Sequence, residues 1–214
     1  MRFAPCEADQ DVWMRPAIKG DGTKYYEYVL CYVDDILVQS TNPGAIMDSL
    51  RKTYVLKKSS VREPDLYLGA DIKKMYISGP EDGDKPRWAM SSDKYAQRAI
   101  DTVEAKLAAT NRRLVTKCST PLSNDYRPEL DQSTELNAED QNYYQGLIGV
   151  VRWLCELGRI DILVAISLMS RHLVSARIGH LEQLFHVFAY IKHHKRSSIV
   201  FDNTMPDYAA DRWT

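Results

Sequence analysis

The sequence lacks the features that mark several common classes of protein. Its four cysteines are widely spaced and form no Cys-x-x-Cys pair, which argues against a zinc ribbon or a disulfide framework and favours reduced thiols. No apolar run has the length of a membrane span, and the residues after Met1 do not form the apolar part of a secretory signal. We therefore expect a globular protein of the cytoplasm or nucleus, not secreted and without a membrane partner.

An excess of positive charge is absent too. The 28 Lys and Arg residues are balanced by 29 Asp and Glu residues, for a net charge of -1. Nucleic-acid-binding proteins usually carry extra basic residues that replace phosphate counterions, so the overall charge does not favour that class. Basic residues are nevertheless concentrated locally, as in the segment 192–196. The five histidines lack the spacing of zinc ligands, which argues against a histidine metal site.

Two adjacent carboxylates, Asp34 and Asp35, are the most informative feature that is present. They separate the apolar runs 28–33 and 36–38, which do not alternate with polar residues and so predict a buried hairpin covered on both faces. A two-residue turn favours Asn-Gly or Asp-Gly, and neighbouring anions repel unless a cation is near them. Carboxylate oxygens are the ligands that Mg²⁺ prefers. The hairpin is interpreted as part of a phosphoryl-transfer metal site, and the alternative is a solvent-exposed turn.

Residues 31–38, with the sequence Cys-Tyr-Val-Asp-Asp-Ile-Leu-Val, resemble the second catalytic motif of reverse transcriptases. The Tyr-Val-Asp-Asp form is similar to that of copia-type LTR retrotransposons. Later segments are similar to the same family in order and approximate spacing, and the resemblance covers nearly the whole chain: 67–72, 88–95, 119–122, 143–154, 159–162, 168–171 and His180. Several ordered motifs are far more specific than one.

The resemblance implies an RNA-directed DNA polymerase, which is a nucleotidyltransferase that uses Mg²⁺, or Mn²⁺ in its place. Its partners would be an RNA/DNA primer-template and dNTPs. Asp34 would be the direct metal ligand and Asp35 a weaker ligand or an electrostatic helper, so both are the predicted catalytic and metal-binding residues. Tyr32 and Val33 would lie beside the primer end, but ordinary strand packing explains these two residues equally well.

A second group of predicted nucleic-acid-binding residues lies near the end of the chain. Lys192, Lys195 and Arg196 follow an apolar helical pattern, in a region that resembles the part of the family that holds the primer-template duplex. Cations at the C-terminal end of a helix are also favoured by the helix dipole alone. Both explanations of the basic segment stay open.

Some parts of the family pattern are missing. Residues 1–27 do not resemble the fingers or the earlier strand whose Asp supplies the other principal metal ligand, and Asp9 to Asp11 is interpreted as a polar lead-in. Residues 203–214 only faintly resemble the start of an RNase H domain. We therefore expect a fragment of a Pol polyprotein, inactive without its N-terminal half and RNase H region. The alternatives are a non-catalytic remnant with weak nucleic-acid binding and an unrelated cation-binding or scaffolding domain.

The residue pattern predicts an α+β fold, in which a partial polymerase palm, an antiparallel sheet plus a helix, is followed by a helical thumb/connection bundle. The expected regions are a partial palm at 1–90, a helix and extended linker at 91–140, a three-helix thumb/connection region at 141–202 and a truncated tail at 203–214. Strands are predicted at 12–18, 24–33, 36–39, 54–58, 67–77 and 87–90. Three apolar stripes predict the helices of the bundle, at 144–154, 162–173 and 181–191.

Overall fold

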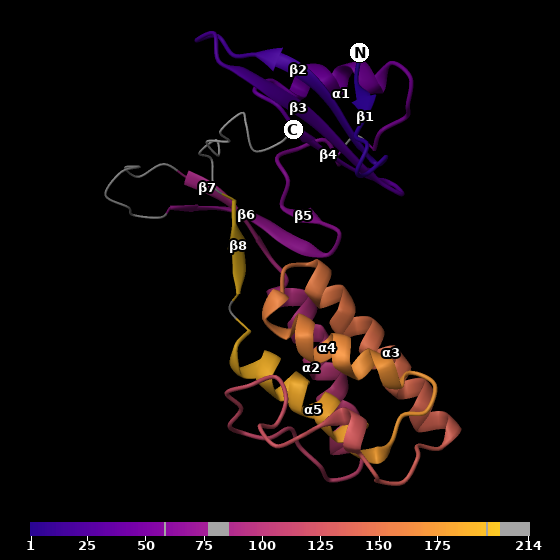
Figure 1. Cartoon of the computed structure of the whole chain (residues 1–214). Coiled ribbons are helices and arrows are strands. Elements are labelled where there is room, and N and C mark those ends of the chain that lie inside the picture. Colours follow the sequence, from indigo (N-terminus) through magenta and orange to yellow (C-terminus); the bar gives the residue numbers. More distant parts are fainter. Residues whose placement is uncertain (58, 77–85, 196, 202–214) are drawn as a thin grey trace, which may run out of the picture. The chain divides into compact units, whose positions relative to one another are not determined.

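The computed structural model describes residues 1–57, 59–76, 86–195 and 197–201 (Figure 1). The chain divides into two compact units, residues 1–68 and 69–214. Antiparallel sheets and helices make up the described residues, which confirms the predicted α+β fold class. The region boundaries expected at residues 90 and 140 stay predictions, and the expected tail at 203–214 lies outside the described residues.

The first unit is built on an antiparallel sheet with the strand order β1-β2-β3-β4. Neighbours along the chain pair with one another, so the sheet is a meander. Its strands are β1 (Ala4–Pro5), β2 (Val12–Ile18), β3 (Lys24–Tyr32) and β4 (Asp35–Gln39). This order brings the start of β2, the end of β3 and the start of β4 to one end of the sheet.

A single helix, α1 (Pro43–Arg51), follows β4. Asn42 caps it, since its side-chain oxygen accepts a hydrogen bond from the Ala45 amide at 3.3 Å, and Ile46 is the helix residue that is buried. The predicted strand at 54–58 is wrong for its described residues. The Tyr54 amide donates to the Leu50 carbonyl at 2.9 Å and so closes the helix end, which removes that amide from any strand ladder. Strand β5 (Leu66–Tyr67) ends the unit.

Three strands of the second unit lie side by side in the order β6-β7-β8. They are β6 (Ala70–Tyr76), β7 (Pro86–Ser91) and β8 (Ser198–Val200). The predicted strand 67–77 is interrupted because Leu68 and Gly69 have φ angles of 53° and 87°, which a strand does not accommodate. β8 was not predicted. It follows the last helix and pairs with β7, with Ser198 opposite Ser91.

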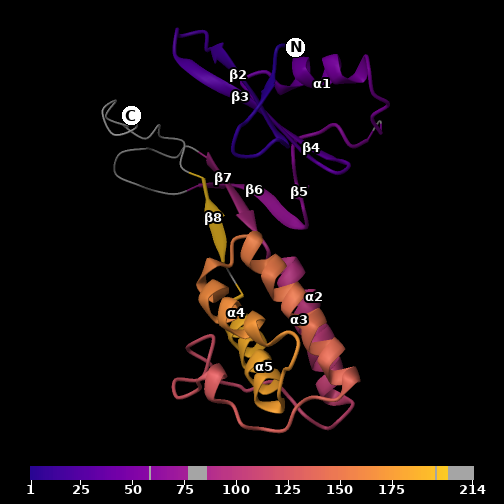
Figure 2. The same ribbon diagram turned by 45° about the vertical axis from the view of Figure 1, so that its right-hand side comes forward.

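The described residues of the second unit also include four α-helices, and both views show them packed together (Figures 1 and 2). Short 3-10 turns lie at Pro128–Leu130, Ile160–Ile162 and Ser170–His172. The linker before α3 is held against the bundle, since the Leu136 amide donates to the Ala176 carbonyl at 2.9 Å and Leu114 is buried. The helices are α2 (Asp93–Ala108), α3 (Ala138–Glu156), α4 (Leu163–Met169) and α5 (Ile178–His193).

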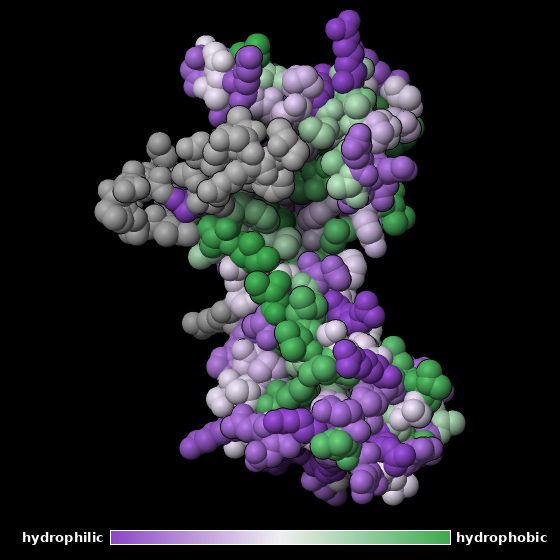
Figure 3. Space-filling view, in the orientation of Figure 1, coloured by the Kyte–Doolittle hydropathy of each residue, from purple (hydrophilic) through white to green (hydrophobic). Residues whose placement is uncertain are grey.

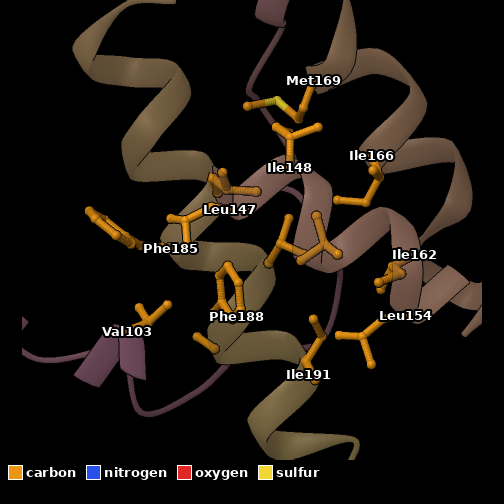
Figure 4. Close-up of a cluster of buried hydrophobic side chains, with 14 of the residues drawn as sticks. Val103, Leu147, Ile148, Leu154, Ile162, Ile166, Met169, Phe185, Phe188 and Ile191 are labelled. Atoms are coloured by element: carbon orange, nitrogen blue, oxygen red, sulfur yellow. The ribbon is translucent and has the colours of Figure 1, made fainter. Parts of the chain in front are cut away.

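The core of the second unit forms where the apolar stripes of these helices meet (Figure 4). The three predicted helical stripes are confirmed, with Tyr144, Ile166 and Phe188 among their buried members. α2 contributes Ile100 and Val103 to the same core, so the bundle has four helices rather than three. The surface of this helical region turned to the viewer in Figure 3 is mainly hydrophilic with scattered hydrophobic residues. This contrast is the usual result of amphipathic helices that bury one stripe each.

Candidate metal-binding hairpin

The two acidic residues lie at the tip of the β3–β4 hairpin. Tyr32 pairs with Asp35, so Val33 and Asp34 are the two central residues of the turn. Asp34 and Asp35 are exposed, and among the described residues neither carboxylate accepts a hydrogen bond or forms an ion pair. The sequence therefore folds into the predicted hairpin, with two adjacent anions whose charge no described cation compensates.

The predicted burial of this hairpin is wrong. In β3 only Glu27 and Val29 are buried, no residue of β4 is buried, and Tyr32 and Ile36 are substantially exposed. The apolar runs indicated cover on both faces, but within the first unit α1 is the one described helix. One helix cannot cover both faces of a sheet, and apolar residues therefore remain exposed at the hairpin tip.

The backbone of the turn is strained at Val33. Its φ angle is 52°, in the region that glycine, asparagine and aspartate tolerate but that β-branched residues rarely adopt. Its side chain is 95% exposed, so no packing within the described residues accounts for a valine at this position. Such a conformation costs about 1–3 kcal/mol and is typical of functional sites. The strain thus points to a role for the tip beyond that of a connecting turn.

Replacing Val33 with glycine should stabilise the hairpin locally. Relief of the strain outweighs the extra freedom that glycine gives the unfolded chain, for a net gain of about 1 kcal/mol. We expect amide hydrogen exchange of β3 and β4 to slow by about fivefold. Val55→Gly is the matched control, because Val55 is also fully exposed but has no positive φ. Unchanged or faster exchange in Val33→Gly would show that the turn is not strained.

Asp9 and Asp11, where the sequence pattern indicates a polar lead-in, lie at the same end of the sheet. The Cys31 amide donates to the Asp11 carbonyl at 2.9 Å, which places Asp11 beside the end of β3. Burial raises the pKa of the Tyr67 hydroxyl, and the negative charges of Asp35, Asp9 and Asp11 raise it further. The negative charges of Asp35, Asp9 and Asp11 therefore all affect the same group of the first unit, the Tyr67 hydroxyl. Counting the β2–β3 register back from the turn at 19–22 could have found Asp11.

The hairpin fits part of a divalent cation site. Mg²⁺ is commonly held by one or two protein carboxylates, with water and substrate phosphates as its other ligands, and Asp34 and Asp35 supply two exposed carboxylates with no competing cation. No group of three or more His, Cys, Asp or Glu side chains among the described residues has an arrangement that could hold a metal ion. Two carboxylates would leave the remaining coordination positions of such an ion to water and phosphate oxygens.

The predicted nucleic-acid-binding lysines lie in the second unit. Lys192, in the last turn of α5, forms an ion pair with Glu104 of α2, with 2.6 Å between Nζ and Oε1. Lys195 follows the helix and donates to the Gln97 side chain at 3.4 Å. The charge of Lys192 is thereby compensated, whereas that of Lys195 faces a neutral amide. Arg196 lies outside the described residues.

Comparison with known proteins gives one informative match. The chain is 30% identical over 167 residues to a Saccharomyces cerevisiae protein described as "Putative transposon Ty5-1 protein YCL074W". The chain is similar to a transposon protein. The match covers 77% of this chain and 48% of the relative, so the chain spans about half the length of the relative. No protein-family model and no solved structure matches the chain.

This similarity supports a transposon origin and leaves the finer assignments as predictions. The assignment to a copia-type reverse transcriptase stays a prediction. So do the metal-binding roles of Asp34 and Asp35, and the nucleic-acid contacts of Tyr32, Val33, Lys192 and Lys195. No described helix is long and apolar enough to cross a membrane.

Proposed function

We propose that this chain is a fragment of the reverse transcriptase of a copia-type LTR retrotransposon. The observation that carries the proposal is the Tyr-Val-Asp-Asp hairpin, in which Asp34 and Asp35 are exposed, uncompensated and joined to a strained turn. Similarity to a transposon Ty5-1 protein supports the proposal. A stable turn would favour glycine or asparagine and fewer charges, so the residues at the tip suit binding better than stability.

In this function the carboxylates of Asp34 and Asp35 would hold Mg²⁺, or Mn²⁺ in its place, together with the phosphates of a dNTP. The ions supply charge neutralisation and activation of the primer hydroxyl during nucleotide addition. Asp34, in the turn, would give the direct ligand, and Asp35, in the strand, a weaker ligand or an added negative charge. Tyr32 and Val33 would contact the primer end, since both side chains are exposed beside the acids.

Metal binding at the hairpin can be tested with the chain itself. We expect Mn²⁺ to broaden the amide NMR signals of Asp34 and Asp35 selectively, because a paramagnetic ion relaxes nearby nuclei. Asp34→Asn should weaken this effect about tenfold, since one of the two anionic ligands is lost. Asp48→Asn is the matched control, because Asp48 is an exposed acid of the same unit that pairs with Arg51. Equal broadening around Asp48 and the hairpin would contradict a specific site.

A second candidate is a non-catalytic remnant that binds nucleic acid weakly. It is favoured by the lack, among the described residues, of a third group that would complete a metal site around the hairpin. Primer extension with the N-terminal half of the polymerase supplied separates the two candidates. Extension that requires Asp34 would support the polymerase fragment. Salt-sensitive binding without extension would support the remnant, and we expect no extension by this chain alone.

A further inference from the structure

A cavity in the second unit lies away from the bundle core. It has a volume of 780 Å³. Its lining consists of Gly158, Ile160 and Asp161, which lie between α3 and α4, and of residues 193–195 and 197–199, which lie at the end of α5 and the start of β8. Ligand-binding clefts commonly have volumes of about 300–1,000 Å³. Its polar lining consists of Asp161, His193, His194, Lys195, Ser197 and Ser198.

One wall of the cavity has a fixed backbone. Gly158 has a φ of 104°, and a Cβ at this position would lie 2.5 Å from Cδ1 of Ile199. Ile199 is held in turn by pairing with Met90 in the sheet. The close approach of these two segments therefore requires glycine. The cavity is thus shaped by β8, which returns the chain to the sheet after α5.

The carboxylate in the lining is already compensated. Arg159 is 1% exposed and grips Asp161 through two hydrogen bonds, with Nε to Oδ1 at 2.9 Å and Nη2 to Oδ2 at 2.8 Å. The hydroxyl of Tyr190 also acts to lower the pKa of Asp161. Asp161 is therefore a poor ligand for a cation, and its charge does little to repel an anion.

The remaining polar groups of the lining can donate hydrogen bonds. Within the described part of the chain, the Lys195 ammonium donates to the neutral Gln97 amide oxygen and forms no ion pair, and His193 has neither a hydrogen-bond nor an ion-pair partner. The Ser198 hydroxyl adds a donor. His194 contacts the Cys118 carbonyl through Nε2 at 3.1 Å, so its Nδ1 remains available. Asp93 of α2 accepts a hydrogen bond from the Ser197 backbone amide at 3.3 Å.

We propose that this cavity binds a phosphate group, with Lys195 as its cationic ligand and His193 and Ser198 as hydrogen-bond donors. An ammonium, an imidazole N–H and a hydroxyl around one concave surface suit an anion with several acceptor oxygens. The source of the phosphate is either a nucleic-acid backbone or a small phosphorylated molecule. The backbone source rests on the proposed polymerase function, whereas phosphate binding itself does not depend on the metal hairpin.

The first test is titration of the ¹⁵N-labelled full chain with inorganic phosphate at constant ionic strength. We expect amide shifts at His193, Lys195 and Ser198 that saturate, and a loss of these shifts in Lys195→Gln. Lys106→Gln is the matched control, because Lys106 is an exposed lysine in the last turn of α2 and outside the cavity. Circular dichroism of both variants verifies the fold. Shifts that do not saturate at the cavity in the wild type would overturn the proposal.

The second test uses a fluorescent RNA/DNA hybrid and measures anisotropy at several salt concentrations. A backbone phosphate in the cavity predicts that Lys195→Gln weakens binding about three- to tenfold and lowers the slope of log K against log salt by about one. Lys106→Gln should change neither. Phosphate shifts without an effect on hybrid binding would assign the cavity to a small phosphorylated ligand. Loss of Mn²⁺ binding at the hairpin would leave both results unaffected, so the two proposals fail separately.

Discussion

A Phe188→Ala variant is expected to lose about 3–5 kcal/mol of the free energy of unfolding of the second unit. The ring of Phe188 is fully buried and shares one core cluster with Val103 of α2 and Leu154 of α3 (Figure 4). Its removal would leave a cavity that these helices cannot fill without moving apart. A domain usually has only about 5–15 kcal/mol of total stability, so the variant should lose a large share of it.

Urea denaturation followed by circular dichroism at 222 nm measures this loss. Phe201→Ala provides the matched control, because Phe201 belongs to the same unit but is 48% exposed. It should cost less than about 1 kcal/mol, since much of its ring already contacts water. Equal losses in the two variants would mean that α5 does not pack at the centre of the bundle.

Removal of the Asp161 carboxylate is expected to lower the free energy of unfolding of the second unit by about 2–4 kcal/mol. The reason is that Asp161→Ala leaves the buried guanidinium of Arg159 without its counterion, and Nη1 of Arg159 already has no hydrogen-bond partner among the described residues. The double variant Arg159→Met with Asp161→Ala should lose less than the single variant, since it removes the buried charge as well. If the double variant is as unstable as the single one, the cost does not arise from an uncompensated charge.

The contribution of Asp161 should depend on pH. Burial acts to raise the pKa of Asp161, but the hydrogen bonds and charge of Arg159 outweigh burial and hold it below its usual value. The folded state therefore binds fewer protons than the unfolded state, whose Asp has a pKa of about 3.9. The stabilisation by Asp161 is complete above the pKa of the unfolded state. It is lost as the pH falls through the lower pKa that Asp161 has in the folded state. The difference in free energy of unfolding between wild type and Asp161→Ala should thus become smaller from pH 7 towards pH 3.

The bundle helices and the acidic hairpin could be predicted from the sequence because their signals are local. Residues such as Tyr144 and Leu147 recur at helical spacing, and Asp34 and Asp35 interrupt an apolar run within a few residues. β8 could not be predicted in this way. It has only three residues, and its partner β7 lies more than 100 residues earlier, so no short window of sequence contains the pairing.

The electrostatic partners of the sites were also beyond the sequence pattern. Asp11 acts on the hairpin end through the register of β2 and β3, which hydrophobic periodicity does not specify. A buried arginine is uncommon, because its charge must be compensated. The burial of Arg159 depends on its ion pair with Asp161, which the sequence pattern does not indicate. The exposure of Ile36 differed from expectation because periodicity reports how apolar a strand is, and not whether another element covers it.

The pairing of Ser91 with Ser198 makes the helical region an insertion within a β-hairpin. The chain leaves the sheet at the end of β7 and returns at the start of β8. Paired residues on antiparallel strands have Cα atoms only about 4.5–5.5 Å apart. The entire bundle therefore begins and ends at almost one point, as a transplantable module does. Residues 92–197 could be grafted as a block into a hairpin loop of another protein, with no need for a spanning linker.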